Sequence, residues 1–179
     1  VSLQLSPSVE VWDLEGQNQY FGGGYHLSFG EESEGSGSRL KVTLVRDDQE
    51  KFTVQHFHRS WELTDPDLYA IWTYNHVPNQ RLNYRALATE TFGDLTTPNS
   101  GIPYALAVNR EGKNLLAIGV RSQNRVINLQ GRPLESGGYE FALDTRLPFE
   151  TDRFEEVVYT DTTPEDWFST TRAYADWVD

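Results

Sequence analysis

The chain has 179 residues, of which 37% are hydrophobic and 13% aromatic, and its formal net charge is -12. A chain of this size buries about two thirds of its extended surface on folding, so we expect one domain with a substantial core and exclude a disordered chain. The absence of Cys excludes disulfides and thiolate metal sites, and the acidic charge excludes nucleic acid as a partner, because that binding depends on Lys and Arg.

The N-terminal segments predict short strands separated by glycine-rich turns. Val9–Trp12 and Tyr25–Phe29 have the composition of strands, and the consecutive glycines from Gly22 to Gly24 indicate a tight turn between them. Gly30–Ser38 consists of Gly, Glu and Ser, which predicts a flexible surface loop. We therefore expect two short strands here, followed by a surface excursion.

A period of two residues is clearest between residues 40 and 57. Apolar side chains alternate with polar ones over Leu40–Leu44, and the turn residues Asp47–Glu50 follow. Beyond the turn, Phe52 and His56 share one phase of the alternation, and Phe57 falls in the other. The pattern predicts a hairpin with one face on a core and the other towards solvent.

The middle of the chain predicts further strands and a second hairpin. The hairpin is expected at Tyr104–Val108 and Leu115–Val120, with Gly112 at a position of positive φ in the turn between them. The other expected strands are Ser60–Leu63, Leu68–Tyr74, Leu82–Thr91 and Arg125–Leu129. Turn signals at intervals of about 8–12 residues leave no room for crossover helices, which favours antiparallel pairing.

The C-terminal segment predicts a strand, a turn, a second strand and a helix. The strands are expected at Tyr139–Leu143 and Phe154–Tyr159, joined through Asp144–Phe149. Pro164–Val178 has a helical pattern, with Thr163 as the expected N-cap. The aromatic side chains of this helix form a broad apolar surface that requires a packing partner, either a sheet of this domain or a second domain. The candidate docking residues are Trp167, Tyr174 and Trp177.

These segments define the fold class as all-β. We expect about eleven strands in a large antiparallel β-sandwich with one C-terminal helix, because so many strands favour two packed sheets over a small closed barrel. The expected organisation is a sandwich domain over residues 1–162 and a helix over residues 163–179 that links it to a following domain.

Two histidines are the first candidates for chemistry. His56 and His58 are two residues apart, so on a strand they share a face and are able to hold one metal ion. Nothing in the sequence fixes a third ligand, the other histidines being His26 and His76. We therefore interpret the pair as polar or sugar-contacting side chains, and the sequence predicts neither a metal site nor a cofactor.

Aromatic side chains are the second candidates. Trp61, Trp72 and Tyr74 lie in or beside predicted strands, close in sequence to the two histidines. Exposed Trp and Tyr rings stack on the apolar faces of sugars, whereas buried rings fill the space between sheets. We expect core packing for these rings, with carbohydrate contact as the alternative.

The sequence predicts no catalytic residue. Its many Asp and Glu residues fall in turns or on polar strand phases, where solubility explains them, and Gly35–Ser38 has the wrong order for a nucleophile elbow. No apolar run approaches the ~20 residues of a membrane span, so we expect no membrane partner.

The C-terminal residues resemble a known domain boundary. The strand Gly137–Leu143, the strand Phe154–Tyr159 and the helix opening Thr163–Trp167, with Tyr174 further on, resemble the end of a particular sandwich domain. That domain is the N-terminal β-supersandwich of α-galactosidase-like enzymes of glycoside hydrolase family 36. The resemblance implies a galactose-mutarotase-like fold and a linker helix into a catalytic β/α barrel. It transfers no catalytic residue, because in that family the catalytic aspartates belong to the barrel.

Three functions are compatible with these residues and with the resemblance. The leading hypothesis is a non-catalytic domain of a glycoside hydrolase that packs on the catalytic barrel and contacts carbohydrate. The first alternative is an independent carbohydrate-binding module, with Trp61, Trp72 or Tyr74 as the stacking platform. The second is a sugar epimerase, since the implied fold also hosts aldose epimerases, and it requires a His and a Glu that converge on one site.

Overall fold

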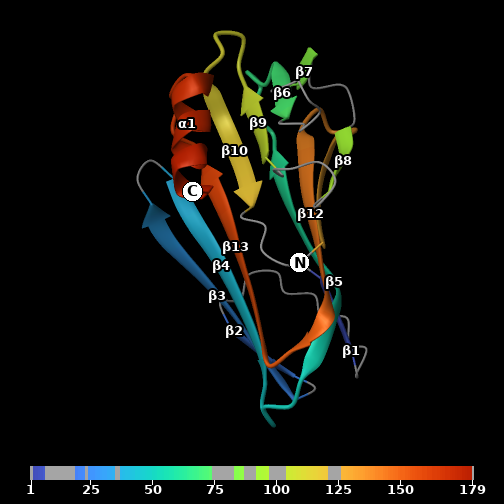
Figure 1. Cartoon of the computed structure of the whole chain (residues 1–179). Coiled ribbons are helices and arrows are strands. Elements are labelled where there is room, and N and C mark those ends of the chain that lie inside the picture. Colours follow the sequence, from blue (N-terminus) through green and yellow to red (C-terminus); the bar gives the residue numbers. More distant parts are fainter. Residues whose placement is uncertain are drawn as a thin grey trace.

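The structure is a computed structural model that describes residues 2–6, 19–22, 24–34, 37–73, 83–86, 92–96, 104–120 and 126–178. Over this part of the chain two antiparallel sheets pack face to face, and one C-terminal helix covers the outer face of the larger sheet (Figure 1). The expected fold class, an all-β antiparallel sandwich with a C-terminal helix, is confirmed.

The smaller sheet is five-stranded in the described residues. Its strands, in spatial order, are β1 (Ser2–Ser6), β5 (Phe52–Leu63), β12 (Tyr139–Thr151), β11 (Val126–Pro133) and β8 (Phe92–Thr96). The longest strands, β5 and β12, lie side by side at its centre and pair antiparallel, with Tyr139 opposite Leu63 at one end.

The larger sheet is eight-stranded over the same part of the chain. Its strands, in spatial order, are β2 (Gln19–Gly22), β3 (Tyr25–Glu34), β4 (Gly37–Arg46), β13 (Arg153–Asp161), β10 (Asn114–Val120), β9 (Tyr104–Val108), β6 (Ala70–Thr73) and β7 (Asn83–Ala86). Every described neighbour pair in it is antiparallel.

The predicted hairpin between residues 40 and 57 is wrong. β4 and β5 belong to different sheets, and β4 pairs instead with β3, with Glu34 opposite Gly37 where a flexible loop was expected over residues 30–38. Alternation along a strand identifies its buried face but not its neighbour, and both strands bury one face in the same interior. The chain crosses from one sheet to the other at residues 47–51, with Gln49 at a φ of 61°.

The second predicted hairpin is confirmed. β9 pairs with β10, and Gly112 in the turn between them has a φ of 76°, a conformation that glycine adopts without strain. The strand expected over Val9–Trp12 lies outside the described residues.

The turn expected over residues 144–149 is wrong as well. β12 continues through Asp144 as far as Thr151, and β12 and β13 lie in different sheets. The buried Thr145 and half-buried Leu147 continue the inward phase of Leu143, so the strand keeps an apolar face beyond the point where the sequence looks polar. This extension places Asp144 on a strand, which matters for the site described below.

The interior between the sheets consists of two apolar clusters. One contains, among others, Ile118, Val158, Leu129 and Phe141, and the second contains, among others, Leu27, Val42, Val54 and Phe154. On β5, β12 and β13 the inward residue between the two clusters is polar: Arg59, Thr145 and Glu156, all of which are buried. A polar layer therefore crosses the core at the level where the clusters meet.

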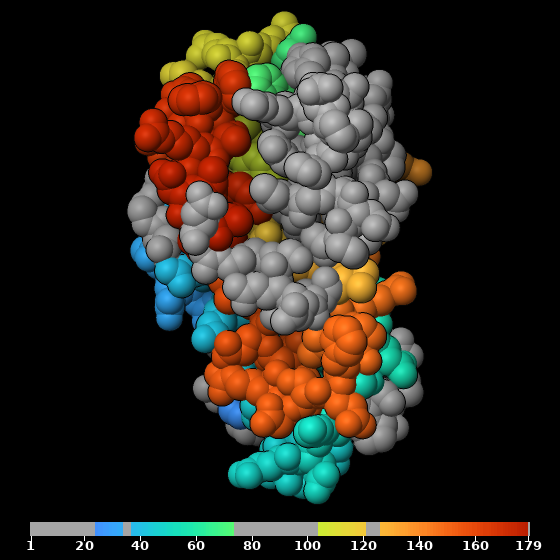
Figure 2. Space-filling view, viewed as in Figure 1, coloured from blue at the N-terminus to red at the C-terminus, as the bar shows by residue number. Residues whose placement is uncertain are grey.

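The helix α1 (Trp167–Val178) packs on the outer face of β9, β10 and β13. Tyr174 stacks on Tyr104 with ring centroids 4.3 Å apart, and its hydroxyl donates a hydrogen bond to the carbonyl of Val120 at 3.1 Å. Figure 2 shows α1 on the outside of the molecule near one end, while the residues around 50 and the β12–β13 connection form the opposite end. In the described part of the chain, no helix has the length and apolarity needed to cross a membrane.

The helix begins later than the sequence predicts, and its N-cap is Asp166 rather than Thr163. The Asp166 carboxylate accepts hydrogen bonds from the backbone N–H groups of Phe168 and Ser169 at 3.0 and 3.1 Å. Asn114 uses the backbone of the preceding segment: its side chain donates to the carbonyl of Thr163, and its N–H donates to that of Glu165. These bonds, together with the one from the N–H of Glu165 to the carbonyl of Thr163, hold residues 163–165 outside the helix, so the first helical turn forms after them.

We expect the Asp166→Ala variant to have a lower melting temperature than the wild-type chain at pH 7, because it loses the cap. The hydroxyl and backbone N–H of Ser169 hold the pKa of Asp166 below its ordinary value of 3.8. A carboxylate with a depressed pKa in the folded state stabilises the fold at pH values above 3.8. This contribution disappears as the pH falls through the pKa of the folded state. Melting curves from pH 7 to pH 2 should therefore show the gap narrowing below pH 3.8. An Asp176→Ala control, near the other end of α1, should show no such gap.

Candidate functional site

A β-bulge on β5 sets the direction of the histidine pair. The register against β1 and β12 skips Gln55, so Val54 and Phe57 both point into the core while Gln55 and His56 both point outward. The sequence pattern had grouped His56 with Phe52 and left Phe57 on the opposite face, and this assignment is wrong. The bulge brings His56 and His58 onto the outer face of the five-stranded sheet.

On that outer face the two imidazoles meet one carboxylate. Asp144 lies directly opposite His58 in the β5–β12 register. Its Oδ1 atom is 2.9 Å from His58 Nδ1 and 3.3 Å from His56 Nε2, and the two rings are nearly parallel with centroids 5.9 Å apart. The carboxylate is largely covered, with 17% of its side chain exposed, whereas the imidazoles are 33% and 37% exposed. The arrangement gathers two nitrogen donors and one oxygen donor at a partly open surface.

Gln130 on β11 supports the carboxylate from the other side. Its Nε2 atom donates a long hydrogen bond of 3.4 Å to the second oxygen of Asp144, Oδ2. Asn128, also on β11, is the register partner of Asp144. The carboxylate is therefore held between β5 and β11, with Oδ1 directed to the histidines.

The second polar group lies inside the core, on the opposite face of β5. Thr145 donates its hydroxyl hydrogen to a carboxylate oxygen of Glu156, and Arg59 is close enough to Glu156 to interact with it electrostatically. Burial lowers the pKa of the Arg59 guanidinium, and the Glu156 carboxylate opposes this shift. An arginine so placed stays protonated, because its ordinary pKa is far above neutral pH. The Arg59 charge is thus compensated from within the core.

Arg59 also reaches a hollow between the sheets. The hollow has a volume of about 460 Å³ and is lined by Phe29, Gly30 and Glu31 of β3, Leu40 and Lys41 of β4, and Arg59 of β5. The guanidinium lies 5.0 Å from the centroid of the Trp61 ring and 5.8 Å from that of Phe29. Its Nη1 atom is buried and has no hydrogen-bond partner among the described residues.

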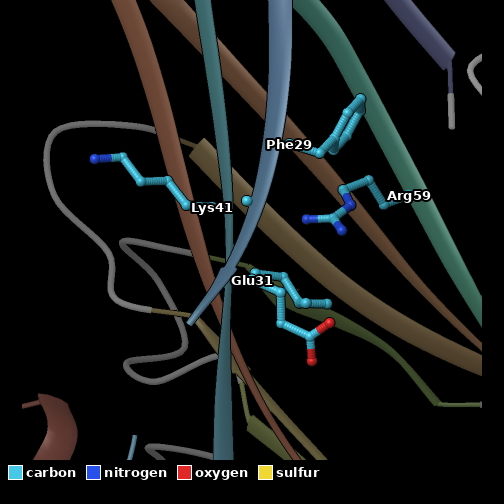
Figure 3. Close-up of a pocket in the computed structure, with 6 residues that line it drawn as sticks. Phe29, Glu31, Lys41 and Arg59 are labelled. Atoms are coloured by element: carbon cyan, nitrogen blue, oxygen red, sulfur yellow. The ribbon is translucent and has the colours of Figure 1, made fainter. Parts of the chain in front are cut away.

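The charged side chains around the hollow point in different directions (Figure 3). Arg59 and Glu31 extend to the same side of β3, with the Phe29 ring beside Arg59, while Lys41 extends to the opposite side. The ammonium of Lys41 pairs with Glu155 on β13 at 3.4 Å. The groups directed to this side of β3 are therefore the hydrogen-bond donor Arg59, the acceptor Glu31 and the aromatic ring of Phe29.

The two tryptophans that were expected in the core, with an aromatic platform as the alternative, do not form a common platform in the described part of the chain. Trp61 is half-buried on the inward face of β5 beside Arg59, and Trp72 is half-buried on β6 with its ring 4.9 Å from that of Trp167. The two rings belong to different sheets and serve packing, as expected for the core interpretation. Tyr74 lies outside the described residues.

The predicted docking residues of the helix pack within this domain. Tyr174 and Trp177 are buried on the outer face of the eight-stranded sheet, and Trp167 packs against the same cluster. Phe168, by contrast, is 59% exposed. Of the two packing partners that the sequence left open for this aromatic surface, the structure supplies the sheet of the same chain.

Several residues of these two sites were missed in the sequence. Asp144 was assigned to a turn and Glu31 to a surface loop, and Phe29, Arg59 and Gln130 were not considered as site residues. A usable signal for Arg59 was its position two residues from both Phe57 and Trp61, because a charged residue in an apolar strand phase requires a partner or a function.

Comparison with known proteins adds no assignment: neither a protein-family model nor a curated protein matches this chain.

The epimerase hypothesis requires a His and a Glu that converge on one site. The hollow contains Glu31 without a histidine among its lining residues, and the paired histidines face an aspartate on the other side of the sheet.

Proposed function

We propose that this chain is a non-catalytic β-sandwich domain that contacts carbohydrate, as part of a glycoside hydrolase of the family 36 type. The observation that carries the proposal is the hollow between the sheets, where the buried guanidinium of Arg59 lies beside the Phe29 ring and retains a hydrogen-bond donor without a protein acceptor in the described residues. Neutral sugars suit a chain with a net charge of -12, which repels anionic ligands.

The hollow supplies the kinds of contact that a sugar ring uses. Phe29 offers an aromatic face for the C–H side of the ring, Arg59 offers an N–H donor, and the exposed Glu31 offers an acceptor for hydroxyl groups. Because Glu156 compensates the Arg59 charge from the core, the site favours hydroxyl groups over an anion. Small-molecule sites have volumes of about 300–1,000 Å³, and the hollow, at about 460 Å³, falls within that range.

The association with a catalytic domain is supported by the architecture. A two-sheet sandwich that ends in a helix is the arrangement that the resemblance of residues 138–177 implies. The exposed Phe168 ring on the outer side of α1 is the apolar contact we assign to a catalytic domain of the same polypeptide. In this arrangement the sandwich would shape one side of the entrance to the active site.

We expect titration with neutral mono- and oligosaccharides to quench or enhance tryptophan fluorescence saturably, because the Trp61 ring lies next to Arg59. A Phe29→Ala variant should bind the same sugar about tenfold more weakly, the amount that loss of one aromatic stacking contact implies. The matched control is Phe149→Ala, which removes a ring that is 63% exposed and lies outside the hollow. Absence of saturable binding across a glycan array, or equal affinity of the Phe29→Ala variant, would contradict the carbohydrate contact.

A hydrolysis assay tests the non-catalytic part of the proposal separately. The chain alone should release no product from aryl-glycosides, and measurable turnover would contradict a non-catalytic role. The independent carbohydrate-binding module is the alternative that the same hollow supports. It would be favoured if the chain binds sugar but does not associate with a family 36 barrel domain supplied in trans, as measured by analytical ultracentrifugation.

A further inference from the structure

We propose that His56, His58 and Asp144 form a binding site for a divalent transition-metal ion on the outer face of the five-stranded sheet. The site is separate from the hollow, because its side chains leave β5 and β12 on the face opposite to Arg59 and Thr145. Two imidazole nitrogens and one carboxylate oxygen suit Zn²⁺ and its neighbours in the first transition row, and the absence of Cys leaves imidazole and carboxylate as the donors.

The three donor atoms have the spacing of metal ligands. His56 Nε2, His58 Nδ1 and a carboxylate oxygen of Asp144 all lie within 4.8 Å of one another. In a tetrahedral zinc site with bonds of 2.0–2.1 Å, neighbouring ligand atoms are about 3.3 Å apart. The measured separations from Asp144 Oδ1, 3.3 Å to His56 and 2.9 Å to His58, are close to this value. An ion could therefore enter with small rotations of the side chains.

The backbone fixes these donors in advance. His56 and His58 are two residues apart on β5, the bulge at Gln55 turns both to the outer face, and the β5–β12 register places Asp144 opposite His58. Gln130 holds the free oxygen of the carboxylate, the kind of outer contact that orients a metal-bound carboxylate. Because the imidazoles are about one third exposed, the coordination positions that the protein leaves open face solvent and are available to water or to a ligand.

A cluster held only by hydrogen bonds is the competing explanation, because protonated imidazole nitrogens would donate to Asp144 at the same distances. The two explanations differ for an Asp144→Asn variant. The amide oxygen still accepts hydrogen bonds from both histidines, but it lacks the charge that makes a carboxylate a strong ligand. The Asp144→Asn variant should therefore keep the fold but bind the metal ion more weakly.

The test is calorimetric titration of the untagged full chain with ZnCl₂ at neutral pH, accompanied by Co²⁺ absorption spectroscopy. We expect one Zn²⁺ per chain and visible Co²⁺ bands of a low-coordinate site with nitrogen ligands. Loss of a contact such as that of Gln130 typically weakens metal affinity by about 10–100-fold. The Gln130→Ala variant should fall in that range, and His58→Ala and Asp144→Asn should lose more than about 100-fold.

A matched control comes from the same strand and face. Glu140 lies four residues before Asp144 on β12 and pairs with Arg132 at 2.8 Å, so Glu140→Gln removes a carboxylate without touching the three donors. It should bind Zn²⁺ as the wild-type chain does. Thermal melting with and without Zn²⁺ checks folding and binding together, since an ion that binds the folded chain raises its melting temperature. Failure of the wild-type chain to bind Zn²⁺, or unchanged affinity in both His58→Ala and Asp144→Asn, would overturn the proposal.

Discussion

Replacing Arg59 by Ala is expected to lower the free energy of unfolding by about 3–5 kcal/mol, the cost of leaving a buried charge without its partner. Arg59 is only 8% exposed, and Glu156 beside it is fully buried. The Thr145 hydroxyl would still donate to that carboxylate, but the compensating guanidinium charge would be gone. Denaturant titration monitored by tryptophan fluorescence and by circular dichroism measures the loss.

The origin of this loss can be separated from simple truncation. A double variant, Arg59→Leu with Glu156→Leu, removes both charges and fills the space, so it should be more stable than Arg59→Ala. Arg132→Ala is the surface control: its side chain is 64% exposed and pairs with Glu140, and its removal should change stability little. If Arg59→Ala were no worse than Arg132→Ala, the polar layer in the core would have no structural role.

Replacing Tyr174 by Ala is expected to lower the free energy of unfolding by about 3–5 kcal/mol, as for other large buried aromatic side chains. The ring is 3% exposed, stacks on Tyr104 and lies close to Tyr159 and Trp177. It is the central contact through which α1 covers the eight-stranded sheet. Tyr174→Phe keeps the ring and loses the hydrogen bond to Val120, so it should cost about 0.5–1.5 kcal/mol.

A double-mutant cycle with Gly119 makes this prediction specific. A Cβ atom at Gly119 would lie 2.0 Å from the Tyr174 ring, so Gly119→Ala should destabilise the wild-type chain by about 1–3 kcal/mol or more through overpacking. In the Tyr174→Ala background the ring is gone, and the same substitution should cost much less. Urea denaturation of the four chains gives the coupling free energy. If the free-energy changes of the two substitutions were additive, the Tyr174 ring would not be in tight contact with Gly119 of β10.

The helix was predictable from the sequence, whereas the residue at which it starts was not. The aromatic spacing along residues 167–178 reflects a helix that needs an apolar surface, and this periodicity is visible without any tertiary information. The cap was misassigned because Thr163, Pro164 and Asp166 all suit a helix start. The start of the helix is set by Asn114, which lies 49 residues from Thr163 in the sequence. Asn114 donates hydrogen bonds to the carbonyls of Thr163 and Glu165, just before the helix.

Local patterning in the sequence determined the fold class, the β9–β10 hairpin and the apolar face of most strands. These features depend on a residue and its near neighbours, because alternation, glycine at positive φ and helical periodicity are local properties. The sequence likewise pointed to His56 and His58 as a pair.

Only the tertiary structure decided which strands pair and which side chains meet. The chain passes between the sheets both after β4 and after β12, and a pattern of alternation looks the same whether the next strand is a neighbour or lies in the opposite sheet. The bulge at Gln55 reverses the face of His56, and the extended β12 brings Asp144, 86 residues from His58, to within hydrogen-bonding distance. Both proposed sites depend on such distant pairings, since each is assembled from strands whose contact is set by the packing of two sheets rather than by local preference.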